Sequence, residues 1–124
     1  SVEVGYLSSV YVSYLDDRRY DPNTALVIGV LHSIGSLPII DYFEQEKIPV
    51  DKFKAVEAEL ANDISTSLVK EWGLPISFQE ALRGTGLYGS ILKYIHAYLD
   101  KQEYDSMLMP FDEFEKIVKQ KFKL

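Results

Sequence analysis

Hydrophobic residues recur at steps of three and four along most of this chain, the spacing that places side chains on one side of an α-helix. The clearest example is a stretch from Asp51 to Trp72, in which acidic residues lie mostly away from an apolar stripe. The stripe consists of Phe53, Val56, Leu60, Ile64, Leu68 and Trp72. The same spacing predicts further helices over about residues 4–15, 22–33, 37–45, 87–98 and 111–122, with a short one after Ser77. Because no alternation typical of a strand extends beyond a few residues, we predict an all-α, multi-helix globular domain.

Several residues predict where these helices begin and end. Asp21 is suited to cap a helix that starts at Pro22, because proline lacks the N–H group that would be unpaired at that position. Gly73 suits the left-handed conformation that ends a helix. Trp72 is the last residue of the apolar stripe, so we expect it to be a buried anchor. Truncating a ring of this size in a core costs about 3–5 kcal/mol.

Length and composition restrict the class of protein. With 124 residues, of which 47% are hydrophobic and 26% charged, residues 1–124 are expected to form one domain. The absence of cysteine excludes thiolate zinc sites, thiol nucleophiles and disulfides. The longest apolar run, Ala25–Leu31, is much shorter than the roughly 20 residues of a membrane span. We therefore expect a cytoplasmic protein without membrane contact.

Charge is distributed unevenly along the chain. The formal net charge is −6. Residues 1–115 carry all 19 acidic side chains and nine of the 13 basic ones, whereas residues 116–124 carry four lysines and no acid. Nucleic-acid binding requires a basic face that neutralises phosphates. The acidic body of this chain therefore argues against nucleic acid as a partner, and the lysines are expected to oppose the negative end of the last helix.

Two segments of the sequence resemble motifs of a known family. The segment Gly29–Gly35, which reads G-V-L-H-S-I-G, is similar to the G-L-L-H-D-I-G motif of HD-superfamily phosphohydrolases. The segment Leu68–Pro75, which reads L-V-K-E-W-G-L-P, resembles the L-L-x-x-W-G-L-P stretch of the HDOD domain, a bacterial signalling output domain of that superfamily. The resemblance implies an HD-type helical fold, with this chain as the C-terminal part of a longer domain.

The resemblance also implies that the family's metal site is degenerate here. The motif histidine is present as His32, but Ser33 stands where the metal-bridging aspartate is expected. Ala61 takes the place of a further histidine, Thr85 that of the first residue of a His-His pair, and His96 falls near the late aspartate. These five residues would line an emptied pocket. We therefore expect no catalytic residue, no bound metal and no cofactor.

The residue chemistry favours the same structural interpretation. Buried histidines usually hydrogen-bond locally, and this is the role expected of His32 and His96. Ser33 directly follows His32, and neighbours on a helix point about 100° apart, so this pair lacks the geometry of a nucleophile and its base. Gly84-Thr85-Gly86 lacks the Gly-Lys-Ser/Thr ending of a phosphate loop and predicts a tight turn between helices.

Tyrosine is the feature that most favours an interaction role. The chain has nine tyrosines, and the residue type is common at protein interfaces because it offers a rigid amphipathic surface. Tyr94 and Tyr98 lie one helical turn apart, which predicts that both lie on one side of a helix as an interaction surface.

These observations lead to one functional hypothesis and two alternatives. The hypothesis is a non-catalytic bacterial signal-transduction module that acts through contact with a protein partner or an adjacent signalling domain. The first alternative is a small-molecule or nucleotide sensor that uses the emptied pocket. The second is a residual metal-dependent phosphohydrolase, which would still lack ligands at Ser33 and Ala61.

Overall fold

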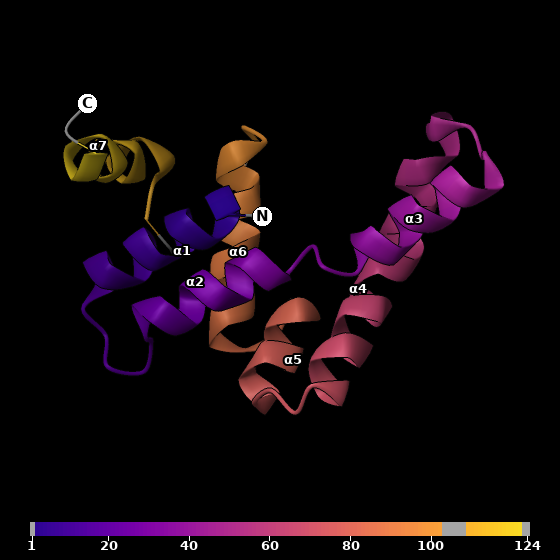
Figure 1. Ribbon diagram of the computed structural model, residues 1–124. Coiled ribbons are helices and arrows are strands. Elements are labelled where there is room, and N and C mark those ends of the chain that lie inside the picture. The colour runs from indigo at the N-terminus through magenta and orange to yellow at the C-terminus, as the bar shows by residue number, and fades with distance from the viewer. Residues whose placement is uncertain (1, 103–108, 123–124) are drawn as a thin grey trace.

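The computed structural model describes residues 2–102 and 109–122, and within these ranges the chain forms helices, turns and bends without a strand. The all-α prediction is therefore confirmed. The helices are α1 (Val2–Leu15), α2 (Pro22–Leu31), α3 (Ser36–Glu46), a short 3₁₀ turn η1 (Val50–Lys52), α4 (Phe53–Glu71), α5 (Ile76–Leu82), α6 (Gly86–Leu99) and α7 (Phe111–Phe122). Figure 1 shows two parts: a body that contains α1, α2, α5, α6 and α7, and a hairpin of α3 and α4 that projects from it.

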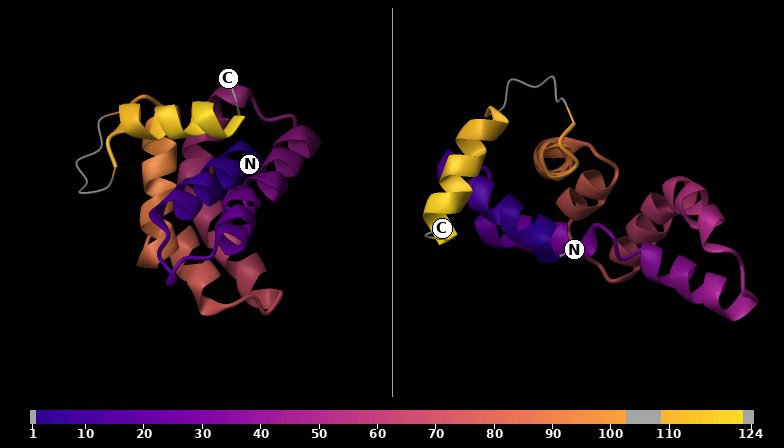
Figure 2. Two further views of the ribbon diagram at one scale, coloured as in Figure 1. Left: turned by 90° about the vertical axis from the view of Figure 1, so that its left-hand side faces the viewer. Right: turned by 90° about the horizontal axis from the view of Figure 1, so that it is seen from above.

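Aromatic rings form the centre of the body. Tyr11 of α1, Tyr94 of α6 and Phe114 of α7 are all fully buried. The Tyr11 and Tyr94 ring centroids are 4.8 Å apart, and that of Phe114 lies 5.5 Å and 5.6 Å from them. These tilted and edge-on arrangements are the favourable ones for aromatic pairs. They fix α7 across α1 and α6, as both views in Figure 2 show for α7 and α1.

Close approach of α1 and α2 depends on two glycines. Gly5 and Gly29 face each other where the helices cross, and a Cβ on Gly29 would overlap the backbone of Gly5. A Cβ on Gly5 would lie 2.5 Å from the carbonyl oxygen of Leu26. No side chain larger than the hydrogen atom of glycine fits at either position without moving a helix. The two glycines are therefore what allows the helices to cross this closely.

The start of α2 follows the sequence prediction. Pro22 occupies the first turn, and the Asp21 carboxylate accepts hydrogen bonds from the backbone N–H of Thr24 at 3.1 Å and from the Thr24 hydroxyl at 2.8 Å. Although α2 is apolar almost all round in the sequence, it is not buried on every side, because Val27 and Val30 are exposed. The reason is that α2 packs mainly on α1, which covers only one of its sides.

The segment Pro22–Glu46 contains an 18-residue window of mean hydropathy 1.6, which by length and composition alone is enough for one membrane-crossing helix. This is weak evidence, because the core helix of a soluble protein passes the same test. In the structure, a turn at residues 32–35 divides the segment into α2 and α3, which pack on different helices. The absence of membrane contact stays a prediction.

The attachment of α4 to the body uses small residues. The turn before α3 passes so close to α4 that a Cβ on Gly35 would overlap the carbonyl oxygen of Ala61, and the Gly35 N–H donates a hydrogen bond of 2.8 Å to the Ser65 hydroxyl. The buried residues of α4 are Ser65, Thr66 and Val69, all in its C-terminal half. The N-terminal half of α4 therefore contacts α3 and η1 without entering the core.

The long apolar stripe of α4 stays outside the core of the body. None of its six residues is fully buried, and Leu60 keeps 43% of its surface exposed. From Phe53 to Ile64 the stripe faces α3 along the projecting hairpin rather than the body, because the body-facing side of α4 is the one that carries Ser65 and Val69. Helical periodicity thus identified an apolar face correctly, and the structure shows that α3 is the partner of its middle part.

The prediction that Trp72 is a buried anchor is wrong, since 53% of its surface is exposed. The chain turns at Gly73, whose φ of +71° is the left-handed stop expected there. Leu74 then donates its N–H to the Val69 carbonyl at 3.1 Å, and its side chain packs against the core. Val69 and Leu74 therefore provide the buried contacts at this end of α4, and the Trp72 ring lies outside them.

Candidate functional site

His32 and His96 come together in the body, although 63 residues lie between them in the sequence. His32 follows the end of α2, His96 lies in the last turn of α6, and their ring centroids are 4.6 Å apart in an edge-on arrangement. The Nδ1 atom of His32 lies 2.6 Å from the Gly29 carbonyl oxygen. Because a carbonyl only accepts, Nδ1 carries the proton in this bond.

Burial controls the charge of both rings. It lowers the pKa of His32 to about 4, and the hydrogen bond to Gly29 only partly opposes this effect. Burial likewise lowers the pKa of His96, with a smaller opposing influence from Asp100. Both imidazoles are therefore neutral near pH 7, and the His32 ring makes the local hydrogen bond expected of it.

The histidine pair offers few ligands for a metal. Among the residues that the structure describes, no three His, Cys, Asp or Glu side chains converge as a metal-binding group. A catalytic zinc site has three protein ligands and an open position, whereas this pair supplies two imidazoles. The geometry alone thus gives no support to a metal-activated water here.

The predicted emptied pocket is not assembled as expected. Ser33 lies in the turn after α2, and Ala61 lies on α4 beside Gly35. Thr85 begins α6, where its hydroxyl donates to the Glu80 carbonyl at 3.0 Å. At 1.5 Å per residue, Thr85 and His96 are about 16 Å apart along the helix axis. Including Thr85 in one pocket with the histidines was wrong, because α6 separates its two ends.

The predicted interaction surface of Tyr94 and Tyr98 is also corrected. Tyr94 is only 1% exposed, and burial raises the pKa of its hydroxyl. Tyr98 is half-buried, with its ring centroid 5.0 Å from that of Phe114 and 5.8 Å from that of Phe111. The two tyrosines do share one side of α6, but α7 covers that side. Tyr94 is therefore a core contact, whereas Tyr98 also lines an apolar groove of about 460 Å³ together with residues of α1 and α7.

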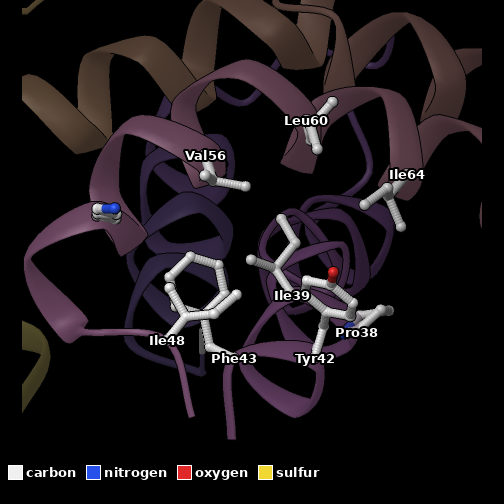
Figure 3. A pocket seen from close by; sticks show the side chains of 9 residues that line it. Pro38, Ile39, Tyr42, Phe43, Ile48, Val56, Leu60 and Ile64 are labelled. Atoms are coloured by element: carbon white, nitrogen blue, oxygen red, sulfur yellow. The ribbon is translucent and has the colours of Figure 1, made fainter. Parts of the chain in front are cut away.

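The structure instead shows an apolar groove of about 590 Å³ between α3 and α4, and we call it the hairpin groove. Its lining is Pro38, Ile39, Tyr42 and Phe43 from α3, Ile48 from the connection, and Lys52, Val56, Leu60 and Ile64 from η1 and α4. In Figure 3 the labelled side chains of the two helices face each other across this space. Lys52 is the single charged residue among them, so the groove offers apolar contact rather than acid–base chemistry.

Local chemistry explains why the hairpin holds this groove. Lys47 ends α3 in the left-handed conformation with φ of +53°, and Ile48 donates its N–H to the Phe43 carbonyl at 3.1 Å. At the tip, the rings of Phe43 and Phe53 meet edge to face with centroids 5.5 Å apart. The tip is thereby closed, while Tyr42 and Leu60 remain 57% and 43% exposed.

The sequence predicted the apolar face of α4 that lines this groove, but not that the face would form an open groove with α3. The signal was present in the stripe of α4 and in the apolar residues of the short helix before it. What the sequence lacked was any indication that the two helices pair mainly with each other. No protein-family model, curated protein or solved structure matches this chain.

Proposed function

We propose that this chain is a non-catalytic regulatory module, of the signalling type that the HDOD resemblance implies, and that it binds a partner protein through the hairpin groove. The observation that carries the proposal is an apolar groove exposed to solvent on a hairpin that projects from the body (Figure 1). Soluble proteins rarely leave contiguous apolar surface uncovered unless it serves an interaction.

The energetic reason lies in the exposed side chains. Tyr42 and Leu60 keep about half of their surface in water, and Val56 and Ile64 are half-buried. Fully burying an aliphatic side chain of this size contributes about 1.5–3 kcal/mol. A partner that completes the burial of these four side chains therefore gains several kcal/mol from a small area, as interface hot spots do.

The histidine pair supports the non-catalytic part of the proposal. Its rings are neutral near pH 7, one ring nitrogen is used in a backbone hydrogen bond, and the pair alone lacks the ligand number of a catalytic metal site. The residual hydrolase alternative has no comparable observation in its favour.

Site-specific photo-crosslinking in cells of the source organism tests the proposal. A benzophenone amino acid replaces Tyr42 in one sample and Tyr14 in the control, since Tyr14 is 50% exposed on α1, outside the hairpin. We expect a defined protein to crosslink from position 42 and not from position 14. The purified partner should then bind the chain and lose at least tenfold in affinity against Leu60→Glu, which would place one charge among apolar contacts.

Two results would overturn the proposal. One is an identical set of crosslinked proteins from positions 42 and 14, which would indicate nonspecific contact. The other is a purified partner that binds Leu60→Glu as tightly as the unchanged chain, because its contact surface would then lie elsewhere. Circular dichroism of Leu60→Glu provides the control that the variant is folded.

A further inference from the structure

Charge around the hairpin groove defines the partner more closely. Residues 36–64 hold seven acidic and three basic side chains. Residues three or four apart are neighbours on a helix surface. Glu57 and Asp63 are each three residues from Leu60, and Glu59 is three from Val56, so these acids border the apolar stripe of α4.

These acids carry no compensating partner inside the hairpin. Within residues 2–102 and 109–122, the ion pair that the structure contains joins Arg19 and Asp17, far from the groove in the body. Glu59 and Asp63 are exposed and Glu57 is half-buried. A ligand with positive charge beside its apolar face would therefore meet carboxylates that have not already been neutralised.

The dimensions of the groove fit a helix. From Lys52 at the end of η1 to Ile64 in α4 the lining spans twelve steps, or about 18 Å, which is slightly more than three turns. A third helix of similar length completes the packing of a two-helix hairpin at the usual axis separation of about 8–10 Å. Helix-in-groove binding uses such apolar anchors at positions i, i+4 and i+7.

We infer that the occupant of the hairpin groove is an amphipathic helix of about twelve residues from another protein, with lysine or arginine beside its apolar face. This inference rests on the proposed function and adds the chemistry of the partner. A second copy of the same hairpin fits less well, because a symmetric contact would bring two sets of acids together. The chain's own helix α7, whose last turn carries Lys119 and Lys121, is already engaged, since Phe114 is fully buried in the body.

Two matched synthetic peptides test the charge rule while the natural partner is still unidentified. Each is a stapled 14-residue helix with leucines at i, i+4, i+7 and i+11, flanked by lysines in one peptide and by glutamates in the other. Binding to the whole chain is measured by fluorescence anisotropy. In about 50 mM salt we expect the lysine peptide to bind roughly tenfold more tightly, and this ratio to shrink in about 500 mM salt because exposed charges are screened.

Variants of the chain locate the effect. Glu59→Lys combined with Asp63→Lys should abolish or reverse the preference for the lysine peptide. The matched control, Glu3→Lys combined with Glu115→Lys, makes the same change of net charge on exposed residues outside the hairpin and should leave the preference intact. Leu60→Glu should weaken the lysine peptide at least tenfold, because the anchoring contact is apolar.

The possible failures are distinguishable. If the glutamate peptide binds equally or more tightly and Leu60→Glu weakens it, the groove is a docking site and the inferred charge of its occupant is wrong. If neither peptide binds, the inference is overturned, while crosslinking from position 42 decides the proposed function separately. If sedimentation shows a dimer that Leu60→Glu dissociates, a second copy is the occupant instead.

Discussion

Replacing Phe114 by alanine removes the ring through which α7 enters the core. This ring is fully buried, and its centroid lies 5.5 Å from that of Tyr11, 5.6 Å from that of Tyr94 and 5.0 Å from that of Tyr98. The truncation therefore leaves a cavity bordered by three aromatic rings that cannot all collapse into it. Phenylalanine-to-alanine changes in cores cost about 3–5 kcal/mol.

That cost is large for a domain of this size, whose total stability is expected to be about 5–15 kcal/mol. Trp72→Ala is the matched control, because it removes a larger ring whose surface is 53% exposed. Substitutions at such surface positions usually change stability by about 0.5 kcal/mol or less. We expect Phe114→Ala to be the much less stable of the two.

Urea unfolding monitored by far-UV circular dichroism measures both changes in the free energy of unfolding. The test is which of the two variants loses more free energy of unfolding. If Trp72→Ala costs several kcal/mol and Phe114→Ala costs less than about 1 kcal/mol, then the packing of α7 and the exposure of Trp72 are both wrong. A change in the slope of ΔG against urea concentration for Phe114→Ala would show that α7 unfolds separately.

Three further outcomes follow from the fold. Gly29→Ala should destabilise the chain by about 1–3 kcal/mol in thermal melting, because the added methyl group overlaps the backbone of Gly5. Leu60→Glu should change stability by only about 0.5 kcal/mol in urea unfolding, because Leu60 borders solvent. Burial sets the folded pKa of His32 at about 4, below its unfolded value of 6.5, so its contribution to stability is present above pH 6.5 and lost as pH falls toward 4. In thermal melting across this pH range, His32→Gln should lose less stability than the unchanged chain. Equal losses of stability would contradict the burial of the ring.

Helix boundaries were predictable because their causes are local. Asp21 caps α2 through its own carboxylate, and Gly73 provides the left-handed turn after α4. Each effect involves residues within a few positions of one another, so the sequence displays all the participants. The lysines at the end of α7 follow the same logic of favourable charge at a helix C-terminus.

Which face of each helix is buried was much less predictable. The side of α4 that enters the body carries Ser65 and Val69, and its closest approach is to Gly35. A search for hydrophobic residues overlooks such a face. Its small residues stabilise the fold because they let two backbones come close together, and not because they remove a large apolar area from water. Tyr94 illustrates the opposite error, since its burial depends on α7, which lies in a separate part of the sequence.

The candidate site shows the same limit. Proximity of His32 and His96 arises from two helix ends meeting, which spacing in the sequence cannot measure. Thr85 was included by position relative to a motif, yet it lies at the far end of α6 from His96. The hairpin groove was visible as an apolar stripe but became a surface only when the structure showed that no helix of the body covers it.

Helix packing explains the two glycines on either side of His32 without any metal chemistry. Gly29 lies where α2 crosses α1 at Gly5, and Gly35 lies where the following turn meets the backbone of α4. A side chain at either position would separate elements that the fold brings into contact. His32 lies midway between them and bonds back to the Gly29 carbonyl. Packing thus accounts for Gly29 and Gly35 without any metal, and so a segment that resembles a motif of metal-dependent hydrolases is compatible with the proposed regulatory role.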